Sequence, residues 1–145
     1  MSQPQNLEAK RALKSFEFAQ FGNKKKFNYS VAVQVLPSMI RMNGLRATMA
    51  YFYSKEGQYR AVFDQIYEWF NVEDEPTKFM WAKIQISSEN KKSVDFMEIL
   101  LELTDDEYRI VQAETMTLAN WMIRFAKKDG LNSQPNTTTD DINEP

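Results

Sequence analysis

The chain of 145 residues contains neither cysteine nor histidine. Without cysteine it can form no disulfide and no thiolate zinc site, and it has no thiol nucleophile. Without histidine it lacks Ser-His-Asp chemistry and the side chain that most often transfers protons near neutral pH. An enzyme is still possible, but it is the least supported class of function, and we expect no catalysis, no metal and no cofactor.

Glycine and proline are scarce, at four and five residues, which disfavours a turn-rich β-sandwich or barrel. Apolar runs are only a few residues long, so we expect no membrane-spanning helix, and the first residues show no secretory signal. The absence of cysteine fits a reducing compartment, and we predict a cytoplasmic protein. Aromatic residues make up 13% of the chain and provide enough apolar surface for one core.

The length is that of a single domain, which we place at residues 1–128. Residues 129–145 contain four acids, no base and almost no large apolar side chain. Burying such a segment cannot offset the conformational entropy that ordering would cost. We therefore predict a flexible, disordered acidic tail after the domain.

Apolar residues recur at three-and-four spacing along most of residues 6–128, which predicts an all-α domain. Further stripes of this kind run through residues 45–57, 59–70 and 93–103. Residues 71–77 are predicted to be a loop, and residues 78–90 stay ambiguous. Residues 6–21 predict a helix that ends at Gly22-Asn23. Its predicted buried stripe consists of Ala9, Ala12, Leu13, Phe16 and Ala19. Its basic residues Lys10, Arg11 and Lys14 are predicted to face solvent.

The last predicted helix begins with a capping box, Thr104-Asp105-Asp106-Glu107. In this motif the threonine hydroxyl and the glutamate carboxylate each satisfy a backbone donor, which explains the carboxylates better than a metal cluster does. The apolar face continues to Phe125, and Gly130 predicts the end of the helix. Glu114 lies in the middle of this helix, and we expect it at the edge of the buried face.

Residues 28–42 give conflicting signals. Val31, Val33 and Val35 alternate as in a strand, whereas the apolar residues that follow have helical spacing. Pro37 would either kink a helix or open a new one at its first turn. Composition alone leaves the choice open, but the segment carries no charge between Asn28 and Ile40, so we expect it to be largely buried.

The charge is unevenly distributed along the chain. The net charge of the whole is −2, but residues 1–60 hold ten basic and three acidic residues, a balance of +7. Lys24, Lys25 and Lys26 form a short basic connector. Such a block is typical of a surface that meets nucleic acid, although basic residues more often only solvate the outer faces of helices.

A second basic group surrounds one predicted turn between helices, at Arg41, Asn43, Gly44 and Arg46. With Asn43 as N-cap, this turn would leave backbone amides unpaired at a helix start, where an anion is favoured. The two arginines would add forked donors suited to phosphate oxygens. The turn therefore predicts a grip on a nucleic-acid backbone without base readout, the alternative being a capped turn with two solvated arginines.

Two stretches resemble one known family. Residues 36–52 read Leu-Pro-Ser-Met-Ile-Arg-Met-Asn-Gly-Leu-Arg-Ala-Thr-Met-Ala-Tyr-Phe, and residues 103–109 read Leu-Thr-Asp-Asp-Glu-Tyr-Arg. Both, together with residues 114–126, resemble the small subunit of the type III-B CRISPR effector, the RNA-targeting Cmr complex. The similarity spans residues 1–128 in length and order, and the tail has no counterpart.

The resemblance implies a compact all-α fold of six or seven helices, in which Pro37 lies in a kinked helix. It implies a non-catalytic subunit whose copies stack head to tail along the guide RNA–target RNA duplex, beside other subunits, in antiviral defence. The predicted RNA-binding residues are Lys24, Lys25, Lys26, Arg41, Asn43, Gly44 and Arg46. Two alternatives stay open: a helical protein–protein adaptor without RNA contact, and the small subunit of the related type III-A complex. No membrane partner is expected.

Overall fold

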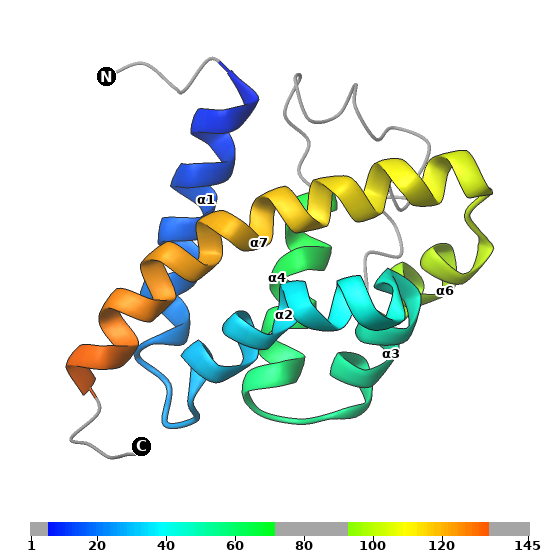
Figure 1. The fold of residues 1–145 in the computed structure, drawn as a ribbon. Helices are drawn as coiled ribbons and strands as arrows, with labels where there is room; N and C mark the ends of the chain where they lie inside the picture. Colours follow the sequence, from blue (N-terminus) through cyan, green and yellow to red (C-terminus); the bar gives the residue numbers. More distant parts are fainter. Residues whose placement is uncertain (1–5, 72–92, 134–145) are drawn as a thin grey trace.

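The computed structural model describes residues 6–71 and 93–133, and within these ranges the chain forms six α-helices and no strand (Figure 1). The helices are α1 (Leu7–Gly22), α2 (Tyr29–Asn43), α3 (Leu45–Ser54), α4 (Gln58–Phe70), α6 (Ser93–Glu102) and α7 (Asp105–Ser133). The all-α prediction is therefore confirmed. No helix in the described part of the chain is both long enough and apolar enough to cross a bilayer.

Helix α7 organises the fold. Its 29 residues correspond to a length of about 43 Å at 1.5 Å per residue. It lies across both α1 and α2, while α2 also packs against α3 and α4 on its other side (Figure 1). Helix α6 lies at the end of the molecule where α7 begins, next to α3.

The largest side chains of the core are aromatic and come from α2, α3, α4 and α6. The largest fully buried side chains are Trp69, Tyr29, Phe52, Phe63, Phe70 and Phe96. Tyr29 donates its hydroxyl hydrogen to Gln65 Oε1 at 2.5 Å, and Gln65 Nε2 donates to the backbone carbonyl of Phe18 at 3.0 Å. Burial raises the pKa of Tyr29 well above its usual value, so this hydroxyl stays protonated.

The ambiguous segment at residues 28–42 is helix α2, so the strand signal from its alternating valines was wrong. Ala32, Val33 and Leu36 are all buried, because helical spacing turns them toward the core. Pro37 lies inside the helix, as the family resemblance implied. Burial between α3, α4 and α7 outweighs the β preference of single valines, since burial rather than propensity supplies most helical stability.

The buried face of α1 is rotated from the predicted one. Ser15, Phe18, Ala19 and Gly22 are buried, whereas Leu13 and Phe16 are each 44% exposed. A Cβ atom at Gly22 would lie 2.4 Å from the Tyr29 ring, so the glycine permits close contact between α1 and α2. The predicted stripe was built on Leu13 and Phe16, and periodicity alone does not tell which of two overlapping apolar faces meets the core.

The other predicted helices agree with the structure in most respects. In α3 the predicted stripe, which consists of Leu45, Thr48, Met49 and Phe52, is buried. The capping box forms, with Thr104 N donating to Glu107 Oε1 at 3.0 Å and Glu107 N donating to Thr104 Oγ1 at 3.3 Å.

Helix α7 runs to Ser133, so the prediction that Gly130 ends it was wrong. The first residues assigned to the acidic tail, 129–133, continue that helix, because a single glycine lowers helix propensity without breaking the hydrogen-bond ladder. Residues 134–145, residues 72–77 of the predicted loop and the ambiguous residues 78–90 lie outside the described residues.

Candidate nucleic-acid interface

The two predicted basic groups lie at opposite ends of α2. Lys24–Lys26 precede its first residue, and Arg41–Arg46 surround its last. A helix of 15 residues is about 22 Å long, so the two groups are not neighbours (Figure 1). The structure therefore divides the predicted RNA-binding residues into two separate sites.

At the C-terminal end of α2, the turn into α3 is closed by side chains of α7. Leu45 N donates to the Tyr108 hydroxyl at 2.7 Å and to Gln112 Oε1 at 2.8 Å, and Arg46 N donates to the same hydroxyl at 3.3 Å. These amides were predicted to be open to an anion, and that prediction was wrong. The protein itself supplies the acceptors that a phosphate would have provided.

The predicted N-cap was also wrong. Asn43 is the last residue of α2, and Gly44 joins the two helices without a side-chain cap. Gly44 has φ +86°, a conformation that glycine adopts without strain, and a Cβ there would lie 2.9 Å from the Tyr108 hydroxyl oxygen. Both the backbone conformation and the approach of α7 thus require glycine at this position.

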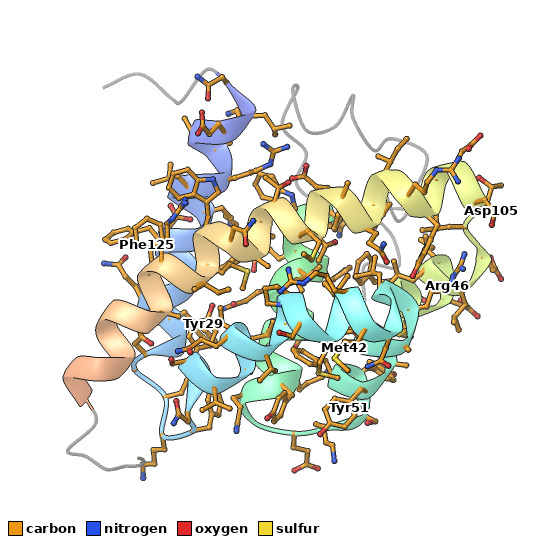
Figure 2. The ribbon with its side chains drawn as sticks, in the orientation of Figure 1. Tyr29, Met42, Arg46, Tyr51, Asp105 and Phe125 are labelled. Carbon is orange, nitrogen blue, oxygen red and sulfur yellow. The ribbon has the colours of Figure 1, made fainter. Side chains whose placement is uncertain are left out.

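Arg46 is used inside the protein. Its Nε donates to the carbonyl of Leu100 at 2.8 Å and its Nη2 donates to the carbonyl of Leu103 at 2.8 Å. These carbonyls belong to the C-terminal end of α6 and the residue after it, where backbone acceptors lack helical partners. The guanidinium also lies over the Tyr108 ring, 4.2 Å from its centroid. In Figure 2, Arg46 lies where α6 meets α7.

Arg41 and Asn43 are exposed at the same end of α2. Among the described residues Arg41 has no acidic partner within ion-pair distance, so its charge faces solvent. This end of α2 therefore offers one solvated guanidinium in place of the four-residue phosphate grip that the sequence indicated.

The N-terminal end of α2 keeps its charge on the surface. Lys24, Lys25 and Lys26 are all exposed and form no ion pair with the described residues. The turn between α3 and α4 lies against this connector, since a Cβ at Gly57 would be 3.7 Å from the Phe27 ring. That turn brings Lys55, also exposed, to the same surface.

A pocket of about 480 Å³ opens between the connector, the α3–α4 turn and the exposed side of α4. We call it the connector pocket. Its lining residues are Phe21, Lys25, Phe27, Lys55, Glu56, Gly57, Arg60, Ala61, Asp64, Gln65 and Glu68. Lys25 is the one member of this lining that the sequence singled out as an RNA contact. Phe21, Lys55 and the others did not stand out, because they come from three segments that only the tertiary fold brings together.

Two of the three acids in the pocket are neutralised by neighbouring bases. Glu68 forms an ion pair with Lys14 at 2.8 Å, and Asp64 forms one with Arg60 at 3.3 Å. Glu56, Lys25 and Lys55 also line the pocket, and the described residues provide no ion pair for the two lysines. The lining itself holds three basic and three acidic side chains, so the positive excess of this surface comes from Lys14, which pairs with Glu68, and from Lys24 and Lys26 of the adjoining connector.

Glu114 is buried, 5% exposed, rather than at the edge of its face as expected. Arg11, predicted to face solvent, instead reaches inward and binds both carboxylate oxygens, at 2.8 and 2.6 Å. Trp69 Nε1 donates to the same carboxylate at 2.9 Å. The carboxylate raises the pKa of Arg11, chiefly through this hydrogen bond. The cluster ties α1, α4 and α7 together.

The described residues contain no group of three or more acidic side chains arranged to hold a metal ion. The Glu107 carboxylate accepts a hydrogen bond from the backbone amide of Thr104, and Asp106 pairs with Arg109. Within the described part of the chain, the basic connector and the connector pocket are candidate sites for a ligand.

Residues 5–129 match the family described as CRISPR-associated protein (Cas_Cmr5). No curated protein sequence matches the chain.

Proposed function

This chain belongs to the Cas_Cmr5 family, the small subunit of the type III-B CRISPR effector, and from that premise we propose that its basic connector holds RNA by its phosphates. Membership makes it a subunit of a multi-subunit effector complex and sets aside the type III-A alternative. In the proposal the subunit is non-catalytic and contacts the guide RNA–target RNA duplex beside other subunits and neighbouring copies of itself, in antiviral defence in the cytoplasm.

The proposal rests on which basic side chains at the two ends of α2 are solvated and which are already bonded within the protein. Lys24, Lys25 and Lys26 are solvated and have no acidic partner among the described residues, so they are available to phosphate oxygens. Two nitrogens of Arg46 already donate to the carbonyls of Leu100 and Leu103, so we no longer propose that Arg46 contacts an RNA phosphate. Arg41 stays a candidate contact at the far end.

One observation favours an adaptor role, and it concerns the N-terminal end of α7. Asp105 and Asp106 are exposed at the start of α7, and Glu102 is exposed at the end of α6. Figure 2 places Asp105 on the other side of the molecule from Tyr29, the residue that follows the connector segment and begins α2. A basic surface at one end of a molecule and an acidic one at the other are complementary in a head-to-tail contact. In this second proposal the lysines meet the acidic end of a neighbouring copy, with no RNA between them.

The test replaces Lys24, Lys25 and Lys26 together by alanine in the assembled complex and measures target RNA affinity between 50 and about 200 mM salt. Each phosphate contact contributes roughly 0.7 to the log–log salt slope for single strands. If all three lysines contact phosphates, the slope should flatten by about 2. Affinity should fall about equally for unrelated target sequences, because phosphates carry no sequence information.

Two controls accompany this variant. The triple replacement by arginine keeps the charge and should keep the salt slope, and Arg109→Ala removes a charge at the acidic end of α7. An unchanged slope for the alanine variant, with normal incorporation into the complex, would contradict RNA contact by the connector. Loss of incorporation with an unchanged slope would support the adaptor proposal instead.

A further inference from the structure

We propose that the connector pocket holds one unpaired nucleobase of a single RNA strand, stacked against Phe21, while Lys25 and Lys55 hold the adjacent phosphates. This inference rests on the proposed function and deepens it. Phosphate contact by the connector needs no pocket, whereas the placement of a base requires a concave site with an aromatic wall.

Phe21 is the first reason for the proposal. It lies in the last turn of α1 with half of its surface, 51%, open to solvent. Phe16, the other exposed phenylalanine of α1, packs edge-on against Phe125 at 5.3 Å between ring centroids. Among the described residues Phe21 meets no other aromatic ring, and it lines the connector pocket instead. An apolar ring at the wall of an open site indicates a ligand with a flat face.

The size and chemistry of the pocket suit a nucleotide. A volume of about 480 Å³ lies within the range of sites for small ligands and accommodates a single base. Every base has a π-face, so stacking on a phenylalanine is largely independent of sequence. Such tolerance matches a subunit whose phosphate contacts also carry no sequence information.

The positions of the ammonium groups distinguish a nucleotide from a purely apolar ligand. Lys25 Nζ lies over the Phe21 ring, 4.4 Å from its centroid, and Lys55 Nζ lies over the ring of Tyr51, which is outside the pocket lining, 4.9 Å from its centroid. Both lysines line the pocket, and neither has an ion-pair partner among the described residues. An aromatic ring and two ammonium groups in one lining match the two parts of a nucleotide, its aromatic base and its anionic phosphate. For a base to stack on the covered face of Phe21, the Lys25 ammonium has to move off the ring and onto the phosphate.

The experiment compares two oligomers that differ only in their bases. Full-length protein is titrated at about 50 mM salt into oligouridine and into an abasic ribose-phosphate oligomer of the same length. Both carry the same number of phosphates, so counterion release is equal and any difference comes from the bases. The wild-type protein should bind oligouridine at least about five-fold more tightly, the lower limit for stacking one base on an aromatic side chain.

The variants locate the base. Phe21→Leu keeps an apolar side chain but removes the flat ring, and it should bring the two oligomers to equal affinity. Phe21→Trp should keep or increase the preference for oligouridine. Phe16→Leu is the matched control, because it changes a similarly exposed phenylalanine of the same helix outside the pocket, and it should keep the wild-type preference. Circular dichroism and the urea midpoint verify that each variant is folded.

The outcomes separate this inference from the proposed function. If the wild-type protein binds both oligomers equally, or if Phe21→Leu keeps the preference, the base site is wrong and phosphate contact still stands. If the wild-type protein binds neither oligomer, the base site is wrong, and the salt series in the assembled complex decides phosphate contact by itself. Binding of an acidic peptide in place of both oligomers would identify the pocket as a protein-docking site.

Discussion

At the N-terminal end of α2 three lysines face solvent, whereas at its C-terminal end Arg46 turns back and binds backbone carbonyls of α6. Both ends are basic in the sequence, and Arg41 stays solvated as the lysines do. Arg46 differs because acceptors lie within its reach and because its side chain suits them. A planar guanidinium donates from several nitrogens at once and matches paired acceptors inside a fold. A lysine ammonium is strongly hydrated and costs more to bury, so it remains on the surface.

Arg11 extends this comparison to a second site. Like Arg46, it lies in the basic first block of the chain, and it binds a buried acceptor, the carboxylate of Glu114. The local count of positive charges is therefore a poor measure of a nucleic-acid surface in this protein. Arginines that find internal acceptors must be removed from that count. The exposed bases that remain in the first block are the three connector lysines, Arg41 and Lys55.

The largest expected effect comes from removing the internal acceptor of Arg11. Glu114→Ala leaves the guanidinium and Trp69 Nε1 without their shared partner in a buried position. Loss of one member of a buried ion pair typically costs about 3–5 kcal/mol, so we expect a loss of unfolding free energy of that size. Urea denaturation measures it. Glu17→Ala, which removes an exposed acid, should leave the midpoint nearly unchanged, and equal effects of the two would contradict the structural role of Glu114.

A smaller loss is expected at the turn after α2. Arg46→Ala removes two charge-assisted hydrogen bonds to carbonyls at the end of α6, each worth about 1.5 kcal/mol or more. We expect the unfolding free energy to fall by about 3 kcal/mol. Arg46→Lys should recover only part of this, since an ammonium cannot reproduce the forked geometry. Full recovery by lysine would show that charge alone is sufficient at this position.

The smallest effect on stability is expected at the other end of the comparison. Alanine at Lys24, Lys25 and Lys26 removes no hydrogen bond or ion pair within the described part of the chain. The urea midpoint of this triple variant should therefore match that of the wild-type protein, even though its RNA affinity is expected to fall. A clear loss of stability would show that the connector packs onto the protein, and the proposed division between interior arginines and surface lysines would then fail.

Helical periodicity and local capping signals were sufficient for the helix class of the described chain and for particular elements. The stripe of α3 and the capping box before α7 depend only on residues three or four positions apart, so the sequence predicts them correctly. The same reasoning failed for α1, because its Leu13–Phe16 face and its Ser15–Phe18 face overlap and only packing selects between them.

The candidate site was predicted in part. The connector lysines follow from the charge distribution alone, and the structure leaves them exposed. Phe21 and Lys55 did not stand out, because 34 positions of chain separate them and their shared pocket exists only after α1, α3 and α4 have packed. The Arg46 turn was predicted as open, because its acceptors on α6 and α7 lie more than 50 residues away in the chain.

By itself, then, the sequence determined what depends on near neighbours along the chain: the helices, the capping box and the excess of positive charge in the first block. The tertiary structure alone decided which of those charges remain available to a partner. That outcome depends on whether a buried acceptor from a distant segment comes within hydrogen-bond reach, as it does for Arg11 and Arg46 and does not for the connector lysines. A hydrogen bond acts only over about 3 Å, so only the folded chain determines which distant groups meet.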